Sequence, residues 1–188
     1  PRKGRALVVG SASGWELEAL SALGLDAVGI DVKPFGSAVV RGSATALPFR
    51  IGSFEALVCN RTLPHIPDVR SAIREFARVL VPDGRLLLTV GNRYAYTFLS
   101  LRLDAGRRIP NPNDSFYQLY TRAEISRLLA GAGFEVRGLR TCHYAPRQWA
   151  GNGSTEFLRI LARLDHPLGR NLISGRFGPL LLVYGVLR

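Results

Sequence analysis

Residues 5–14 read Arg-Ala-Leu-Val-Val-Gly-Ser-Ala-Ser-Gly, and this stretch decides the fold. The apolar run that follows Arg5 is short, nearly continuous and β-branched, which is typical of a strand buried on both faces. Glycine and other small residues then replace it, as happens where a chain turns sharply and its backbone comes close to other groups. We therefore predict a buried strand over residues 5–10, a tight turn over 10–14 and a helix over about 14–23.

Working outward, apolar runs alternate with segments of helical period, which indicates an α/β domain. Further strands are predicted over residues 26–31, 38–42, 54–60, 85–90, 134–142 and 179–187. Helices are predicted over residues 69–80, from the capping box Thr121-Arg122-Ala123-Glu124 to Gly131, and over 155–164. Two stretches without clear period, about 92–120 and 145–177, are predicted to be a lid or acceptor-binding insertion and a second variable segment.

The chain of 188 residues has a length expected of one domain, and 47% hydrophobic residues suffice for a packed core. Its two cysteines, Cys59 and Cys142, lie far apart without CxxC spacing, so neither a zinc site nor a disulfide framework is predicted. We expect no metal and a cytoplasmic location. No apolar run approaches the roughly 20 residues of a membrane span, so none is predicted. Because the chain opens at Pro1 and contains no Met, we expect its natural start to lie upstream.

The net charge of +11 is concentrated in the second half of the chain. Residues 92–188 hold 14 basic and 6 acidic groups, whereas residues 1–91 hold 11 and 8. Arginine binds phosphates and carboxylates in bidentate fashion, so this half favours an anionic acceptor, RNA or an acidic protein partner. A basic solvated surface is an equally open interpretation, and no RNA-binding module signature is present.

The predicted first turn has features of a nucleoside site. Asp31 ends the second predicted strand 21 residues after Gly10, where a carboxylate can bind both hydroxyls of a ribose. The turn lacks the G-x-G-x-x-G pattern of dinucleotide sites, and Glu16 and Glu18 would oppose a diphosphate at the helix N-terminus. S-adenosylmethionine carries no phosphate and has two cationic groups. It therefore fits better than NAD, although a tight turn with a capping Asp remains an alternative.

The order and spacing of several motifs resemble the class I S-adenosylmethionine-dependent methyltransferases, in particular the small-molecule group that includes the ubiquinone and menaquinone methyltransferases. The resemblance covers nearly the whole chain. It rests on the turn 10–14, Gly29-Ile30-Asp31, the stretch 42–49 (Gly-Ser-Ala-Thr-Ala-Leu-Pro-Phe), Ser53-Phe54-Glu55, the stretch 63–68 (Leu-Pro-His-Ile-Pro-Asp), the stretch 77–86 (Ala-Arg-Val-Leu-Val-Pro-Asp-Gly-Arg-Leu) and the stretch 131–134 (Gly-Ala-Gly-Phe).

This resemblance implies a Rossmann-like sheet of seven strands in the order 3-2-1-4-5-7-6, with the last strand antiparallel and helices on both faces. It also implies S-adenosylmethionine as cofactor and assigns its binding by position. In these assignments, Gly10, Ser11, Ala12 and Gly14 belong to the turn at the methionine part, Asp31 binds the ribose, Val32 lies on an adenine face, Ser43 and Ala44 line the adenine edge, and Asn60 and Arg61 lie at the methionine end.

Three positions depart from the family pattern. Val8 and Ser43 stand where the family usually has Asp, and Ala12 replaces a glycine. These changes remove an acidic partner, a charged acceptor and backbone clearance. They support a second hypothesis, a catalytically silent methyltransferase-like protein that binds RNA or an acidic partner. A third, an NAD-linked reductase, would require nicotinamide nucleotide binding.

Methyl transfer chiefly requires alignment of the acceptor with the methyl group, and a base where the acceptor must lose a proton. His65 and His143 are the candidate bases, each with a purely structural role as the alternative. Arg93, Tyr94, Tyr96 and Tyr117 are the candidate acceptor-binding residues, although aromatic residues in an insertion often only pack it. The sequence therefore predicts methyl transfer to an unidentified acceptor. The basic second half of the chain favours an anionic one.

Overall fold

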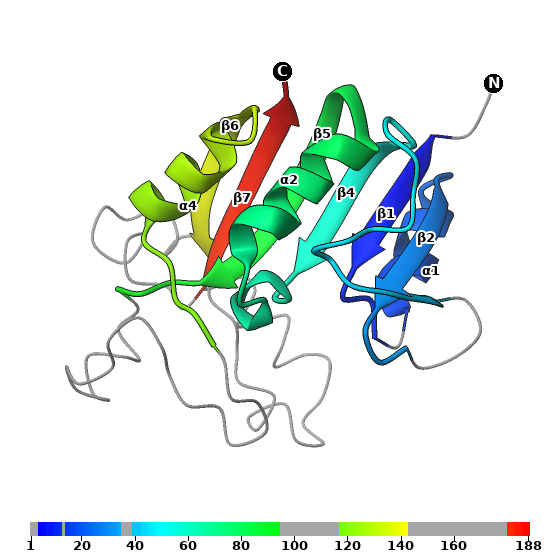
Figure 1. Cartoon of the computed structure of the whole chain (residues 1–188), viewed down its shortest axis with the longest axis horizontal. Helices are drawn as coiled ribbons and strands as arrows, with labels where there is room; N and C mark the ends of the chain where they lie inside the picture. Colours follow the sequence, from blue (N-terminus) through cyan, green and yellow to red (C-terminus); the bar gives the residue numbers. More distant parts are fainter. Residues whose placement is uncertain (1–3, 13, 35–38, 95–116, 143–179) are drawn as a thin grey trace, which may run out of the picture.

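The protein is described by a computed structural model over residues 4–12, 14–34, 39–94, 117–142 and 180–188, without the side chains of Trp15 and Cys142. The strands form one seven-stranded sheet in the order β3-β2-β1-β4-β5-β7-β6 (Figure 1). Their bounds are β1 (Arg5–Val9), β2 (Asp26–Asp31), β3 (Val39–Arg41), β4 (Phe54–Asn60), β5 (Leu80–Gly91), β6 (Phe134–Cys142) and β7 (Leu180–Leu187).

The directions of the strands agree with the predicted topology. β3, β2, β1, β4 and β5 are parallel neighbours, and β7 is antiparallel to both β5 and β6. The described helical elements are α1 (Trp15–Ala22), η1 (Leu63–His65), α2 (Val69–Val79) and α4 (Arg122–Ala130). The predicted order of strands and the antiparallel last strand are confirmed. The predicted helix over 155–164 lies outside the described residues.

Helices cover both faces of the sheet. In Figure 1, α2 and α4 lie in front of it and α1 lies behind β2. The larger core lies under α2 and α4, where Ile73, Phe76, Ile125 and Leu129 are fully buried against the central strands. A smaller core on the side of α1 contains Val8, Leu17 and Val39. Burial on both faces explains why β1 is apolar at consecutive positions.

Helix starts follow local sequence chemistry. The Thr121 hydroxyl accepts from the Glu124 backbone N–H at 3.2 Å, and the Glu124 carboxylate accepts from the Thr121 N–H at 2.9 Å. The predicted capping box is therefore confirmed at the N-terminus of α4. The Asp68 carboxylate caps α2 in a similar way, because it accepts from the Ser71 N–H at 3.0 Å.

The fifth strand is longer than predicted. We expected residues 85–90, but β5 begins at Leu80, which is buried and pairs with Phe54. Between this pair and the next, β5 advances to Arg85 while β4 advances only to Ala56. The turn residues Pro82-Asp83-Gly84 thus form an irregularity inside the strand rather than a boundary before it. Pairing with β4 overrides the local turn signal.

The two ends of the first predicted insertion lie side by side. Asn92 and Tyr120 form an isolated parallel bridge, and the Tyr120 N–H donates to the Gly91 carbonyl at 2.9 Å. The Arg93 N–H donates to the Tyr120 carbonyl at the same distance. Residues 95–116, and residues 143–179 with the second predicted variable segment, lie outside the described residues.

Candidate functional site

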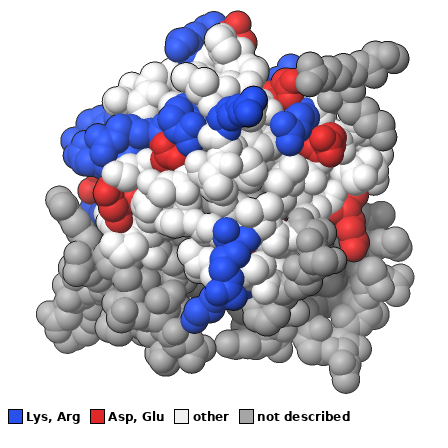
Figure 2. Space-filling model, turned by 45° about the vertical axis from the view of Figure 1, so that its right-hand side comes forward, with Lys and Arg blue, Asp and Glu red and all other residues white. Residues whose placement is uncertain are grey.

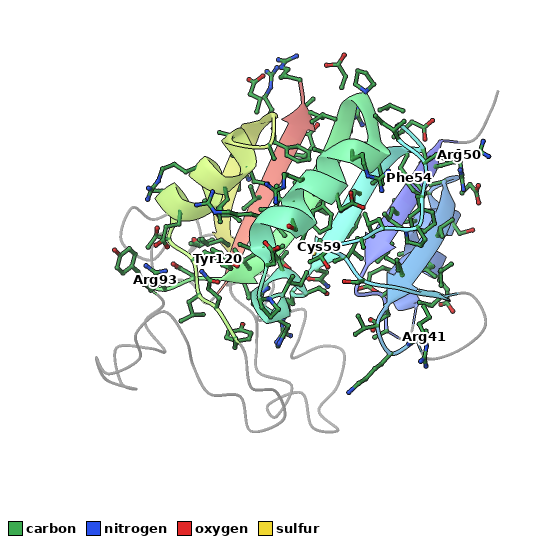
Figure 3. All side chains as sticks on the ribbon, in the orientation of Figure 1. Arg41, Arg50, Phe54, Cys59, Arg93 and Tyr120 are labelled. Atoms are coloured by element: carbon green, nitrogen blue, oxygen red, sulfur yellow. The ribbon has the colours of Figure 1, made fainter. Side chains whose placement is uncertain are left out.

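The candidate site lies at the carboxyl ends of β1, β2, β4 and β5, the lower edge of the sheet in Figure 1. The chain leaves β1 toward β2 on one side and later returns to β4 on the other, so β1 and β4 flank a topological switch point. Open α/β sheets bind ligands in the crevice outside such a point. Figure 3 shows Arg41 and Arg93 near this edge, and Arg50 at the opposite one.

The first turn is built on left-handed backbone. Gly10, Ala12 and Gly14 have φ of 76°, 39° and 80°, and the Gly10 N–H donates to the Ile30 carbonyl at 2.8 Å. A side chain at Gly10 would overlap that of Thr62, so β1 and the end of β4 approach closely there. Ala12 adopts the left-handed region despite its methyl group. The predicted tight turn is confirmed, and the departure at Ala12 does not prevent it.

Asp31 ties this turn to the end of β2. Its Oδ2 accepts from the Ala12 N–H at 3.0 Å, and its Oδ1 accepts from the Lys33 N–H at 2.8 Å. An ionised carboxylate has about four acceptor positions, so each oxygen can still accept from a ligand hydroxyl. The chemistry and position of this carboxylate fit the ribose of S-adenosylmethionine.

Two residues of the turn region point into the protein. Val8 is buried in the small core with Leu17 and Val39, which explains an apolar residue there in place of an acid. Ser11 is 1% exposed and its side chain covers Gly29 of β2. Within the described chain, its hydroxyl oxygen has no hydrogen-bond partner. The Ser11 side chain is therefore packed within the fold, and the contact of Ser11 with the methionine part stays a prediction.

A polar network joins the ends of β4 and β5 to α1. The Thr89 hydroxyl donates to Asn60 Oδ1 at 2.6 Å and accepts from the Arg61 N–H at 2.8 Å. Asn60 Nδ2 donates to Glu16 Oε1 at 3.3 Å. Arg61 has a φ of 55°, an unusual value for a residue with a side chain. The network therefore fixes both the amide of Asn60 and the turn that follows β4.

On the predicted adenine side, Ser43 and its neighbours form a small hydrogen-bonded structure. The Ser43 hydroxyl lies 2.8 Å from that of Thr45 and accepts from the Thr45 N–H at 3.2 Å. Ala44 is buried, whereas Val32 is 62% exposed beyond the end of β2. The exposure of Val32 fits a residue that an aromatic ligand would cover.

An ion pair on α2 holds the loop that follows this adenine side. Arg78 pairs with Glu75 at 2.6 Å and donates to the Phe49 and Leu47 carbonyls at 2.8 and 2.9 Å. Glu75 also accepts from the Leu47 N–H at 2.7 Å. The Arg78 guanidinium is the main cause that holds the pKa of Glu75 below its usual value. Three hydrogen bonds thus fasten residues 47–49 to α2.

Next to the predicted methionine end, His65 and Tyr117 pack edge-to-face, with ring centroids 5.0 Å apart. The Gln118 N–H donates to the Pro64 carbonyl at 2.9 Å, which ties the return of the chain to η1. Burial raises the pKa of Tyr117, and the nearby charge of Arg61 partly opposes this. His65, Tyr117 and Arg61 therefore lie together, and Tyr117 stays a neutral phenol near pH 7.

The remaining predicted acceptor-binding and catalytic residues are Arg93, Tyr94, Tyr96 and His143. Arg93 pairs with Glu124 at 2.7 Å and donates to the Leu119 carbonyl at 3.0 Å, so its charge is used within the fold. Tyr94 is 62% exposed. Tyr96 and His143 lie outside the described residues. Burial raises the pKa of Cys59 to about 12, so this cysteine is no thiolate nucleophile.

Sequence reasoning missed the role of Thr89, and it considered Glu16 only as an obstacle to phosphate. A polar residue in the otherwise apolar run Leu86–Val90 was the available signal for Thr89. No comparable signal pairs Glu16 with Asn60, because 44 positions separate them.

Several basic side chains on the surface form ion pairs with acidic ones. Figure 2 shows Lys and Arg beside Asp and Glu over much of the upper part of that view. Arg5 pairs with Asp26, Arg137 with Glu135, and Arg188 with Glu135 and Asp83. Binding of RNA or an acidic protein stays a prediction. No helix in the described part of the chain is long and apolar enough to cross a membrane.

Comparisons with known proteins agree with this geometry. A family model described as a methyltransferase domain matches residues 7–88. The ubiquinone biosynthesis O-methyltransferase of Xanthomonas axonopodis pv. citri is 28% identical over 164 residues, which cover 78% of this chain and 69% of that protein. Such matches favour the enzyme over the catalytically silent alternative.

Two solved structures share the fold. The YcgJ protein from Bacillus subtilis has a TM-score of 0.67 at 21% identity, with 99% of this chain and 92% of that one covered. An S-adenosylmethionine-dependent methyltransferase from Mesorhizobium loti has a TM-score of 0.67 at 14% identity, with 98% and 91% covered. These two structures show the fold, and the methyltransferase-domain match, the relatives and the sheet order support the resemblance to the class I S-adenosylmethionine-dependent methyltransferases.

Proposed function

We propose that this protein methylates a hydroxyl oxygen of an anionic aromatic small molecule. The observation that carries the proposal is the cluster of His65, Tyr117 and Arg61 beside the methionine end of the cofactor site. The curated relatives named ubiquinone biosynthesis O-methyltransferase support an oxygen acceptor.

The assigned cofactor residues form the first part of this proposal. Gly10, Ser11, Ala12 and Gly14 would supply backbone groups of the turn, and Asp31 would accept from the ribose hydroxyls. Ser43, Ala44 and Val32 would enclose the adenine, with Asn60 and Arg61 at the methionine end. The bound cofactor supplies an electrophilic methyl group on a positive sulfur.

The proposed acceptor-binding residues act on the molecule that receives the methyl group. An aromatic hydroxyl must lose its proton as the new O–C bond forms, and the imidazole of His65 can accept that proton at a ring nitrogen. The guanidinium of Arg61 would stabilise the developing oxyanion and attract an anionic acceptor. Tyr117, whose ring packs on His65, would wall the acceptor ring and exclude water.

Methyl transfer from labelled S-adenosylmethionine to a panel of hydroxylated aromatic acids, their methyl esters and aromatic amines tests the proposal. We expect methylated oxygen and a preference for the free acids. His65→Gln should lower kcat about 100-fold or more, because the variant lacks the base that accepts the hydroxyl proton. Binding of S-adenosylhomocysteine should stay unchanged, because His65 is not expected to touch the cofactor.

Arg61→Gln should raise KM for the free acids and leave KM for the esters unchanged. Arg50→Gln is the matched control, because Arg50 lies at the opposite edge of the sheet (Figure 3). Equal methylation of acids and esters by the wild-type protein, or full kcat in His65→Gln, would contradict the proposal.

A further inference from the structure

The methionine end of S-adenosylmethionine carries an ammonium group, and a buried or half-buried cation needs a carboxylate or other acceptors near it. At the ends of β1, β2 and β4 and on the first turn of α1, two described carboxylates accept hydrogen bonds from the turn or from the end of β4: Asp31 from the Ala12 N–H and Glu16 from Asn60 Nδ2. Glu18, the other acid in the first turn of α1, is exposed and makes no such bond in the described structure.

These two carboxylates lie toward different parts of the site. Asp31 ends β2 and is bound to the turn by the Ala12 N–H. Glu16 reaches Asn60 at the end of β4, on the other side of β1. Two strand spacings separate β2 from β4, which places the strand ends roughly 10 Å apart. With Asp31 at the sugar, as the proposed cofactor site has it, Glu16 lies on the side of the amino acid part.

The network fixes the direction of the Glu16 carboxylate. Because Asn60 Oδ1 accepts from Thr89, its amide nitrogen must face Glu16. Among the described residues, this bond of 3.3 Å to Oε1 is the hydrogen bond that Glu16 makes. The side chain is half-buried, and its second oxygen retains its capacity to accept. A partly desolvated carboxylate held in this way is suited to a cationic ligand group.

We propose that Glu16 is a cofactor-binding residue whose carboxylate, oriented by Asn60 and Thr89, accepts from the ammonium group of the cofactor. Val8 leaves the end of β1 without the acidic residue that is usual in the family. In this proposal, Glu16 in the first turn of α1 supplies the carboxylate instead. This role is independent of the identity of the acceptor, so failure of the proposed O-methylation would leave it intact.

The test compares two nucleosides in calorimetric titrations. S-adenosylhomocysteine carries the amino acid part, whereas 5′-methylthioadenosine lacks it. Glu16→Gln should weaken S-adenosylhomocysteine about tenfold or more, as for a lost hydrogen bond between charged groups, and change the affinity for 5′-methylthioadenosine less than twofold. Glu16→Ala, which leaves no side-chain acceptor, should weaken S-adenosylhomocysteine at least as much.

Glu18→Gln is the matched control, because it removes the other acid from the same first helical turn. It should change neither affinity, and thermal unfolding checks that all variants remain folded. Equal weakening of both nucleosides by Glu16→Gln would mean that Glu16 only stabilises the helix. An unchanged ratio of the two dissociation constants would likewise overturn the proposal.

Discussion

At the scale of single residues, Gly10 and Ala12 show two different demands on the first turn. Both have positive φ, but space decides which side chain is tolerated. The Ala12 methyl group coexists with an N–H that donates to Asp31. At Gly10, a side chain would overlap Thr62. The family's glycine is therefore replaceable at position 12 and required at position 10.

We predict that Gly10→Ala destabilises the protein far more than Gly24→Ala. Gly24 has a similar φ of 82°, yet a side chain there would meet nothing within 4 Å. Both substitutions carry the left-handed penalty of about 1 kcal/mol. Gly10→Ala also forces the ends of β1 and β4 apart, which adds an overpacking cost of about 1–3 kcal/mol.

Chemical denaturation of the two variants measures this difference. Thr62→Ala should recover part of the loss in Gly10→Ala, because it removes Oγ1 and Cγ2, two of the three overlapping atoms, and keeps the Cβ. Equal unfolding free energies for the two glycine variants would show that backbone strain, and not the contact with Thr62, sets the requirement.

At the scale of elements, α2 both contributes to the core and positions the loop on the adenine side. We predict that Arg78→Met lowers the unfolding free energy by about 1–2 kcal/mol, since it leaves the Leu47 and Phe49 carbonyls without their donor and Glu75 without its partner. It should also weaken 5′-methylthioadenosine binding, because residues 43–44 precede the released loop.

Arg74→Met provides the control on the same helix. Arg74 is exposed and donates to the Ser71 hydroxyl at 3.0 Å. Its loss should change stability by less than about 0.5 kcal/mol. Chemical denaturation and nucleoside titration of both variants check the prediction. Similar effects of the two substitutions would show that Arg78 does not hold the loop at residues 47–49.

At the scale of the whole molecule, the sheet order brings the ends of β1, β2 and β4 to one edge, so a ligand there should stabilise the entire domain. A cofactor that binds only the folded state adds about 2.7 kcal/mol at a concentration of 100 Kd. For a chain of this size we predict a rise of about 5–10 °C in Tm with saturating S-adenosylhomocysteine.

The two acids at the ends of β2 test whether the stabilisation arises at the predicted edge. Asp31→Asn should abolish most of the rise, whereas Asp26→Asn should keep it. Asp26 begins β2 at the opposite edge and forms an exposed pair with Arg5. Differential scanning calorimetry with and without ligand measures both, and a full rise in Asp31→Asn would place the ribose elsewhere.

Local sequence signals specify most helices and strands of the described chain. Residues 26–31, 54–60 and 134–142 form strands with the predicted bounds, and Thr121 and Glu124 start a helix as predicted. These features are encoded locally, by the period of apolar residues and by turn and capping chemistry. The sheet order came from the resemblance in motif order, since local patterns do not specify which strands pair.

Three features depend on long-range contacts: the residue at which β5 begins, the direction of the Ser11 side chain and the carboxylate that reaches Asn60. Each depends on atoms brought together from distant positions, such as Leu80 with Phe54 or Glu16 with Asn60 and Thr89. A side chain's type and spacing give its chemistry, but its direction follows from packing against neighbours that the fold selects. For this reason the sequence indicates only that Glu16 would oppose a phosphate, whereas its contact with Asn60 makes its carboxylate a candidate partner for a cationic group.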